Sequence, residues 1–309
     1  MVQVLRQINI GCERITMKAN RASKTAQYMA LFRAIETVRH SHKRLFADPY
    51  AIYFLDNGLK WVVKIAALPL FGRLIPKFIQ RKVPGALSSG IARTKLIDEL
   101  LQQTIRYGVR QVIILGAGFD TRVLRLDFLN TIPVIEVDHP DTCDFKVMKL
   151  KEVLGKLPSN VSYYKIDFNK QSLDDLAGRN NFNLSIPTTI IWEGVTGYLT
   201  QQSIDETFEF VEKLARGSYI IFTYVDKQVL DNPQSFIGTE KLFKKLSKND
   251  ERWTFGFKPE ELSDYLTKFH LTMLNDIGAS EYRNKYMPDR KELLKGFEFH
   301  RVVFATRKE

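Results

Sequence analysis

Short apolar runs of strand length alternate with amphipathic runs of helical period over most of this chain. Strands are expected at residues 112–115, 133–138, 161–166, 188–192 and 218–225. Helical patterns lie at residues 142–156, 201–215, 239–248 and 259–268. Two more apolar runs, 271–277 and 300–306, are expected to close the sheet as a strand pair. This alternation predicts an α/β fold: a seven-stranded, mostly parallel sheet with helices on both faces.

The residues ahead of the first strand have a helical pattern instead. One helix is predicted over 23–47, with Ser23 as its N-cap and Asp48-Pro49 as its end. A second is predicted over 88–107, with Ser88 or Ser89 as its cap. We therefore expect residues 1–107 to form a helical cap on a core of residues 108–309, within one integrated domain.

Residues 50–87, between those two helices, alternate apolar patches with basic side chains. Gly72, Pro76 and Pro84 break the run, which predicts a pair of short amphipathic helices that act as a substrate lid. A helix lying on a membrane surface is an alternative, because Trp61, Phe71 and Phe78 stand among the basic residues. Composition favours the lid or ordinary packing.

The positive charge of the chain is concentrated in this N-terminal third. The net charge is +11, with 46 basic and 35 acidic residues in all. Residues 1–100 hold 17 basic and 6 acidic residues, which leaves 46 − 17 = 29 and 35 − 6 = 29 for the rest. The excess indicates either an anionic partner or a solvated basic face. A carboxylate substrate, a carrier protein, a membrane surface and RNA are all open as that partner.

Cysteine content and hydropathy bear on the compartment. Cys12 and Cys143 are the only cysteines, too few for a disulfide framework and at no metal-ligand spacing. No apolar run is long enough to span a membrane, and the first twenty residues have no secretory pattern. A cytoplasmic protein without a metal site is expected.

The candidate site begins where the strand at 112–115 runs into Gly116-Ala117-Gly118. Glycine lets the backbone approach a ligand closely, and ligands of such sheets bind at the carboxyl ends of the strands. A dinucleotide fingerprint would have a third glycine at position 121, where this chain has Thr121. The turn therefore indicates a nucleotide-like ligand and disfavours NAD.

Acidic residues end the next strands of the predicted sheet. Glu136 and Asp138 end the strand at 133–138, and Asp167 and Glu193 follow the strands at 161–166 and 188–192. An acid about 20 residues after the glycine turn accepts hydrogen bonds from ribose hydroxyls. Of the five histidines, His139 alone is expected beside this pocket. No hydrolase, phosphate-loop or zinc-protease motif is present.

These residues resemble those of the leucine carboxyl methyltransferase-like family of class I S-adenosylmethionine-dependent methyltransferases. The resemblance rests on Leu115 to Arg122 and on motifs spread over most of the chain. Those motifs are Ala34-Ile35-Glu36, Leu45 to Tyr50, Ala92 to Lys95 with Ile97-Asp98, Ile135 to Pro140, Asp167-Phe168, Trp192 to Leu199 and Trp253 to Leu262. The branch of bacterial polyketide-type O-methyltransferases looks closer than the branch that methylates protein phosphatases. A Rossmann-like class I methyltransferase fold is implied.

The resemblance also implies roles for particular residues. Arg93 would bind the carboxylate of S-adenosylmethionine, and Gly116 and Gly118 would pass close to its methionine part. Asp138, or less favourably Glu136, would hold the ribose. Further implied roles are adenine contact for Asp167 and Phe168, a place near the transferring methyl for Glu193, acceptor orientation for Tyr198, and a weaker cofactor role for Arg33.

Alternatives remain for some of these residues. Arg93 could instead form a helix-surface ion pair with Asp98 or Glu99, and Tyr198 could simply pack in the core. Trp192 stands where the family often has a small residue before the glutamate, and Gly194 and Gly197 loosen the loop after the strand at 188–192. Those departures are expected on the acceptor side of the pocket.

The activity expected is O-methylation, because most of the catalysis of methyl transfer is positioning. The acceptor would be a carboxylate or acidic hydroxyl of a polyketide-like small molecule, or a protein C-terminus. A carboxylate needs no base, whereas a hydroxyl would need one such as His139 or Glu193. The alternatives are an NAD-dependent oxidoreductase, a basic RNA- or membrane-associated protein that binds S-adenosylmethionine, and a protein of this fold without activity. No nucleic acid partner is expected.

Overall fold

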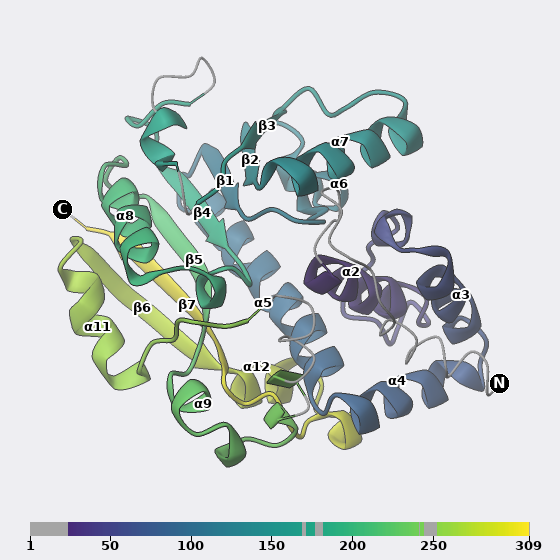
Figure 1. Cartoon of the computed structure of the whole chain (residues 1–309). Helices are drawn as coiled ribbons and strands as arrows, with labels where there is room; N and C mark the ends of the chain where they lie inside the picture. The colour runs from purple at the N-terminus through teal and green to yellow at the C-terminus, as the bar shows by residue number, and fades with distance from the viewer. Residues whose placement is uncertain (1–23, 169–170, 177–181, 241, 244–251, 309) are drawn as a thin grey trace.

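A computed structural model describes residues 24–168, 171–176, 182–240, 242–243 and 252–308 of the chain. Its centre is a seven-stranded sheet in the order β3-β2-β1-β4-β5-β7-β6 (Figure 1). The strands are β1 (Gln111–Leu115), β2 (Val134–Asp138), β3 (Val161–Lys165), β4 (Thr188–Trp192), β5 (Tyr219–Val225), β6 (Leu271–Gly278) and β7 (His300–Arg307).

Five neighbouring strands, β1 to β5, are parallel, and β7 runs antiparallel to both β5 and β6. All seven strands predicted from the apolar runs are present, within two residues of their expected ends. The α/β prediction with a mostly parallel sheet is confirmed. Because β1 lies between β2 and β4, the order of the strands along the sheet reverses there, and the loops that follow β1 and β4 leave a crevice at the carboxyl ends of these strands.

Helices cover both faces of the sheet because the side chains of each strand alternate between them. Val112 and Ile114 face one core, and Ile113 and Leu115 face the other. The first face is covered by α5 (Ala86–Arg106), α7 (Pro140–Leu154) and α12 (Ala279–Tyr286), and α2 (Lys24–Thr37) packs against α5. The second is covered by α8 (Gln201–Glu212) and α11 (Pro259–Thr267).

The first predicted helix ends much earlier than its pattern suggested. Helix α2 stops at Thr37, ten residues before the predicted end at residue 47. The Thr37 hydroxyl accepts the N–H of Asp48, and Arg44 donates to the Thr37 carbonyl at 3.2 Å. One side chain and one backbone N–H of the following loop thus satisfy groups at the helix end, and the hydrophobic period of the sequence contains no signal for these contacts. The expected N-cap, Ser23, lies outside the described residues.

The second predicted helix begins earlier than expected. Helix α5 starts at Ala86, because Gly85 takes a positive φ of 79° and turns the chain into the helix at that point. Ser88 and Ser89, expected as caps, are buried inside the first turns. The helix expected over 239–248 falls mostly outside the part of the chain that the structure describes.

Residues 50–87 form the expected pair of short helices, α3 (Asn57–Ala66) and α4 (Phe71–Lys82), after a turn of 3₁₀ helix at Ala51–Phe54. Pro76 does not break the run as predicted but lies within α4. It removes one helical hydrogen bond, and its ring is buried. Together with α2, these helices lie to one side of the sheet (Figure 1).

Short helical turns complete the described chain. They are α6 (Arg122–Arg125), α9 (Gln228–Asp231) and 3₁₀ turns at Asp127–Leu129, Leu173–Leu176, Thr196–Tyr198, Pro233–Ser235 and Lys291–Leu293. Among the described residues, no helix is both long enough and apolar enough to cross a membrane.

Candidate functional site

A cavity of about 820 Å³ lies between the carboxyl edge of the sheet and the helices of the N-terminal cap. This volume is in the range of ligand pockets. The turn after β1, the ends of β2 and β4 and the loop after β4 form one wall. The cap contributes apolar side chains to the other, among them Met29, Phe32, Leu59, Val62 and Ile79.

The glycine turn after β1 forms part of this wall. Gly116 and Gly118 have φ angles of +60° and +47°, in the left-handed region that other residues rarely adopt. A Cβ added to Gly116 would lie 2.2 Å from Cγ2 of Val195 in the loop after β4. Gly116 is therefore required both by its backbone conformation and by that contact, as a structural and not only a binding residue.

Asp138 ends β2 beside this turn. Its carboxylate accepts hydrogen bonds from the backbone N–H groups of Gly118 and His139. Burial raises the pKa of Asp138, although these two hydrogen bonds oppose the rise. Asp138 lines the cavity, whereas Glu136 does not. The Glu136 carboxylate lies 2.6 Å from Lys146 of α7, so the alternative that assigned the ribose to Glu136 is wrong.

The other residues named from the resemblance are brought to the same cavity. Asp167, Phe168 and Tyr198 line it, and the Tyr198 hydroxyl lies 3.5 Å from that of Thr25 in α2. His139 also lines it, as the N-cap of α7, with a side chain that is about half exposed. Proximity is thus found for the whole set, while the individual roles stay predictions.

Glu193 follows β4 and is held by two guanidinium groups. Arg93 of α5 donates through Nε at 2.9 Å, and Arg122 of α6 donates through Nη2 at 2.8 Å. Burial by itself would raise the pKa of Glu193, but Arg122 and Arg93 keep it below its ordinary value. The Glu193 side chain is therefore a carboxylate that already accepts two charged hydrogen bonds.

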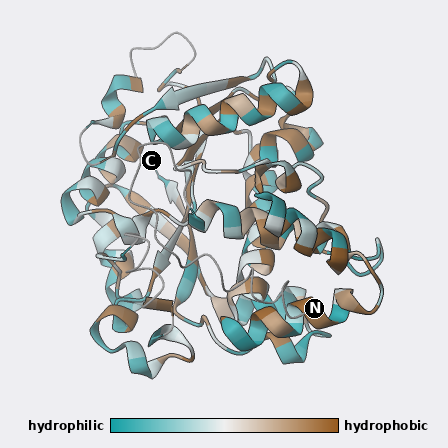
Figure 2. Ribbon diagram, turned by 45° about the vertical axis from the view of Figure 1, so that its right-hand side comes forward, coloured by the Kyte–Doolittle hydropathy of each residue, from teal (hydrophilic) through white to brown (hydrophobic). Residues whose placement is uncertain are grey.

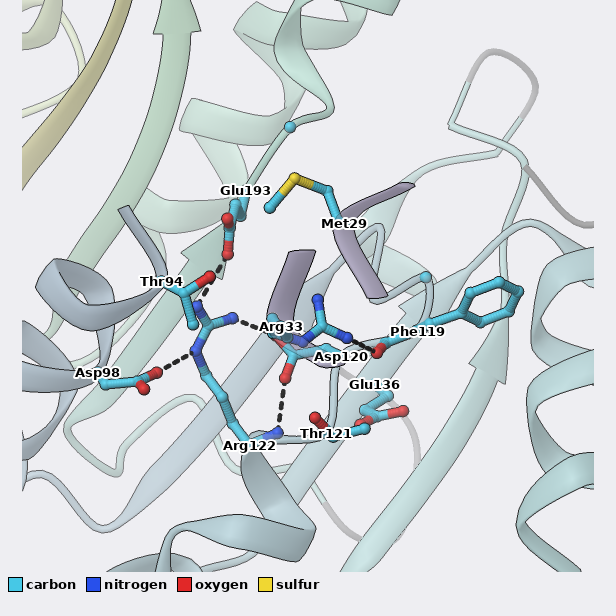
Figure 3. A network of polar contacts seen from close by, with 12 residues as sticks. Met29, Arg33, Thr94, Asp98, Phe119, Asp120, Thr121, Arg122, Glu136 and Glu193 are labelled. Atoms are coloured by element: carbon cyan, nitrogen blue, oxygen red, sulfur yellow. Dashed lines mark hydrogen bonds and ion pairs between the residues drawn. The ribbon is translucent and has the colours of Figure 1, made fainter. Parts of the chain in front are cut away.

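Arg122 is the centre of this network. Besides Glu193, its guanidinium binds Asp98 of α5 at 2.8 Å, and it also contacts Asp120 at the end of the glycine turn (Figure 3). Arg122, Lys146 and Arg33 together outweigh the effect of burial and lower the pKa of Asp120 to about 2. Asp98 also holds Arg125, at 2.5 and 2.8 Å.

A neighbouring set of contacts fixes the cap to the same turn. Arg33 of α2 donates to Asp48 at 2.7 Å and to the carbonyl of Phe119 at 2.5 Å. Thr121, the residue that replaces the third glycine, donates to Asp48 at 2.6 Å. The Thr121 side chain thus joins the cap to the core. A glycine at this position could not make this contact, because it has no side chain.

Several of these residues were not identified from the sequence. The alternative partners proposed for Arg93 were Asp98 and Glu99, but Asp98 belongs to Arg122 and Arg125, and Arg93 pairs with Glu193. The signal present was the run of charges from Asp120 to Arg125 next to the turn. Such residues are seldom fully buried unless paired, and nothing in the sequence indicated that they were buried.

Two expectations about the acceptor side are wrong. Trp192 is fully buried in the second core, where it packs on Phe208 and Phe222, and it does not face the cavity. His139 is not the only histidine beside the pocket, because His300 at the start of β7 also lines it. His300 lies near the C-terminal end of the chain, at the start of the last strand, and nothing in the sequence indicated that this strand reaches the cavity.

His300 lies in an aromatic wall. Its ring stacks on Phe297 at 5.0 Å between centroids and meets Trp253 edge-on at 5.4 Å. Its side chain is buried, and its Nδ1 has no hydrogen-bond partner among the described residues. Burial, with Arg93 and Arg283 nearby, lowers the pKa of His300 well below its ordinary value. The imidazole is therefore neutral at pH 7 and has a free polar atom.

No metal centre accompanies this site in the described part of the chain, where no group of three histidine, cysteine or carboxylate side chains could hold an ion. Cys143, the cysteine that the structure describes, is buried and unpaired. The chemistry available to the site is that of carboxylates, guanidinium groups, hydroxyls and a neutral imidazole.

Comparisons of sequence point to methyltransferases. The "Putative S-adenosyl-L-methionine-dependent methyltransferase YktD" of Bacillus subtilis is 26% identical over 272 residues, 86% of this chain and 80% of that protein. A similarly named protein of Frankia alni is 30% identical over 212 residues, 67% of this chain and 70% of its own length. Both names agree with the interpretation that the glycine turn belongs to a methyltransferase and not to an NAD-binding protein.

Comparison of structures supports the fold. A crystal structure titled as a putative methyltransferase from Thermobifida fusca has a TM-score of 0.57 at 16% identity and covers 91% of this chain and 94% of its own. A protein from Streptomyces avermitilis has a TM-score of 0.55 at 14% identity, over 89% and 100% of the two chains. The sequence profile described as "Leucine carboxyl methyltransferase" matches residues 26–212, which include the glycine turn, Asp138 and Glu193. The chain therefore belongs to the leucine carboxyl methyltransferase family.

Proposed function

We propose that this chain is an S-adenosylmethionine-dependent O-methyltransferase that acts on a carboxylate or an acidic hydroxyl of a small organic molecule. The methyltransferase activity and the cofactor follow from the family. The observation that carries the proposal is the single continuous cavity, which joins the glycine turn and Asp138 to an aromatic wall on the far side of Glu193. Such a cavity has room for a cofactor and an acceptor together.

The residues of the first half fit the cofactor. When bound, S-adenosylmethionine supplies a methyl group on a sulfonium, which is a good leaving group. Asp138 would accept hydrogen bonds from ribose hydroxyls, and Phe168 presents an aromatic ring for the adenine. Gly116 and Gly118 leave the backbone without a Cβ where the methionine part would pass. Arg93 would bind the carboxylate of the cofactor. Glu193 is the carboxylate that Arg93 contacts among the described residues, and it accepts from Nε alone.

The second half fits an amphiphilic or aromatic acceptor. Tyr198, Trp253 and Phe297 provide ring surface, and Lys24 and Lys82 of the cap also line the cavity. The two lysines support an anionic acceptor, because a carboxylate or phenolate is attracted to positive charge as it approaches. A polyketide-like molecule has both rings and acidic hydroxyls. A protein C-terminus is the second candidate. It is favoured only by the family's name, which refers to methylation of a leucine carboxyl group.

The proton of a hydroxyl acceptor would go to His300 rather than to the two bases expected from the sequence. Glu193 already accepts from Arg93 and Arg122, which makes its carboxylate a weak base. His139 is half exposed and lies at a helix N-terminus, where positive charge is disfavoured. His300 lines the cavity with a neutral ring, and its buried Nδ1 has no hydrogen-bond partner among the described residues. It fits the role of general base or acceptor-orienting residue.

The proposal is tested with radiolabelled S-adenosylmethionine. Incubation with a panel of aromatic carboxylic acids, phenols and C-terminal peptides should label one class. A methyl ester releases methanol in mild alkali, whereas a methyl ether does not, so the treatment separates carboxylate from hydroxyl acceptors. Transfer only to nitrogen or carbon, or stabilisation by NAD and not by S-adenosylmethionine in a thermal-shift assay, would contradict the proposal.

His300→Gln is expected to lower kcat for a hydroxyl acceptor by about 10²–10⁴-fold, the usual contribution of a general base. Affinity for S-adenosylmethionine in calorimetry should stay within a few-fold, because the cofactor half of the cavity is unchanged. The matched control is His139→Gln, which should retain most of the activity. If the two variants behave alike, the role assigned to His300 is wrong, while the methyltransferase proposal stands.

A further inference from the structure

The outer surface of α3 and α4 combines exposed apolar side chains with positive charge. Ten large hydrophobic residues of the described chain are exposed, and four of them lie in residues 61–74. Trp61, Leu68, Leu70 and Leu74 have 42%, 52%, 66% and 48% of their surface exposed. Large apolar side chains scattered singly are ordinary, but a cluster on one hairpin requires an explanation.

Positive charge surrounds this cluster, and negative charge is missing from it. The sequence contains no Asp or Glu between Asp56 and Asp98. Along α4, the exposed cations Arg73, Lys77 and Arg81 recur every four residues and so lie on one face. On α3, Lys64 is exposed one turn from Trp61. Part of the positive excess found in the sequence therefore lies on this hairpin, where Lys64, Arg73, Lys77 and Arg81 are exposed and do not line the cavity.

The two kinds of side chain share the outer faces of the two helices, because exposed Leu74 lies one turn from exposed Lys77 on α4. Leu70 and Leu74 are four residues apart and follow the exposed stretch Ala67–Pro69 that joins the helices, so the apolar tip projects between cationic flanks. Figure 2 shows hydrophobic and hydrophilic residues alternating along the cap helices. Basic amphipathic helices with Trp and Leu on their apolar side bind in the plane of a membrane. Figure 1 shows α3 and α4 at the edge of the molecule, away from the sheet.

We propose that the surface formed by α3, α4 and the loop between them binds an anionic lipid bilayer. The cations would contact lipid headgroups, and Trp61, Leu68, Leu70 and Leu74 would enter the boundary between headgroups and acyl chains. RNA is less suitable as the occupant, because three of the four exposed apolar side chains are leucines, which gain nothing from contact with phosphate, and Trp61 alone offers a ring for base stacking. Leu59, Val62 and Ile79 of the same helices line the cavity, so the bound bilayer would lie close to it.

The test uses the full chain and vesicles, and it does not depend on methyl transfer. Wild-type protein should co-sediment with vesicles of phosphatidylcholine and phosphatidylglycerol but not with phosphatidylcholine alone, and salt should weaken the binding. Emission from Trp61 should shift to the blue on binding, and the Trp61→Phe variant should lose that shift. All the side chains concerned are exposed, so their substitution should leave the fold intact.

Substitutions on this surface should weaken vesicle binding in proportion to the positive charge or apolar surface that they remove. Arg73→Gln with Lys77→Gln is expected to reduce vesicle affinity about 30-fold, from about fivefold for each cation at an anionic surface. Leu70→Ser is expected to cost about tenfold, from the apolar surface it no longer buries. The matched controls are Arg106→Gln with Arg110→Gln, and Tyr107→Ser. They alter exposed residues at the far end of α5, about 30 Å along the helix from α4.

Three results would overturn the proposal. They are failure of the wild-type chain to bind anionic vesicles, equal losses in the control variants, and binding to single-stranded RNA without binding to vesicles. Each of these leaves the proposed methyltransferase function untouched. If the wild-type chain binds anionic vesicles but transfers no methyl group to any acceptor, the proposed function fails and the membrane proposal stands.

Discussion

Arg122→Met is expected to destabilise the folded chain by about 3–5 kcal/mol, the usual cost of removing one partner from a buried ionic network. The Arg122 side chain is 3% exposed and pairs with Asp98, Asp120 and Glu193. Asp98 would keep Arg125, and Glu193 would keep Arg93, but Asp120 would lose the partner that contributes most to its low pKa. Urea unfolding followed by circular dichroism measures the change as a shift in midpoint at constant slope.

The same variant should respond differently to acid. The pKa of Asp120 falls from an ordinary 3.8 to about 2 in the folded chain. A carboxyl whose pKa is lowered by folding stabilises the protein fully above pH 3.8, and this contribution disappears as the pH falls through about 2. Without Arg122 the lowering is largely removed. The acid-unfolding midpoint of Arg122→Met should therefore lie at higher pH than that of the wild-type chain.

Two controls separate the ionic network from simple loss of packing. Arg106→Met replaces an exposed arginine at the end of α5 and should change the free energy of unfolding by less than about 0.5 kcal/mol. Adding Asp120→Asn to Arg122→Met removes the unpaired charge and should recover more than about 1 kcal/mol. A small effect of Arg122→Met, or no recovery in the double variant, would show that the network does not stabilise the fold.

Asp138→Asn is expected to weaken the binding of S-adenosylmethionine about 100-fold. An amide keeps the size of the carboxylate but has one oxygen, so it can no longer accept charged hydrogen bonds at both positions. Hydrogen bonds to a charged group are worth about 1.5–3 kcal/mol each, and about 2.7 kcal/mol corresponds to 100-fold in affinity. Calorimetry with S-adenosylmethionine and with its demethylated product should give the same loss, because the ribose is common to both.

The matched control for this variant is Asp141→Asn, which removes an exposed carboxylate in the first turn of α7, three residues away. Its affinity should stay within about twofold of the wild-type value, because a screened surface charge contributes little. Equal affinity of wild-type and Asp138→Asn would remove the ribose role from Asp138. Loss in both variants would indicate a general effect of charge near the pocket.

The sequence predicted most of the sheet because buried strands have a local signature. Apolar runs such as Val112 to Leu115 end at turns that glycine permits, and the ends of all the strands were predicted within two residues. Gly116, Gly118 and Asp138 were placed in one site for the same reason: a parallel sheet brings the carboxyl ends of its strands together. The absence of a third glycine at Thr121 gave the distinction from NAD-binding proteins.

Helix ends and charge pairing needed the tertiary structure. The end of α2 at Thr37 depends on the Arg44 side chain and the Asp48 backbone, seven and eleven residues further on, and α5 begins where Gly85 turns the chain. The partners of Arg93 and Arg122 are separated from them in sequence by up to 100 residues. Their pairing depends on which helix packs on which strand end, and the pattern along the chain does not contain that information.

The sequence by itself thus determined the fold class, the family and the strand ends that line the cavity, because each depends on residues that are neighbours in the chain or at successive strand ends. Only the tertiary structure decided what surrounds that cavity. In that structure, His300 of the last strand lines the cavity, whereas Trp192 is buried in the second core. The tertiary structure also placed part of the positive charge of the cap on the outer face of α3 and α4, since the faces of a helix are distinguished only by what packs against them.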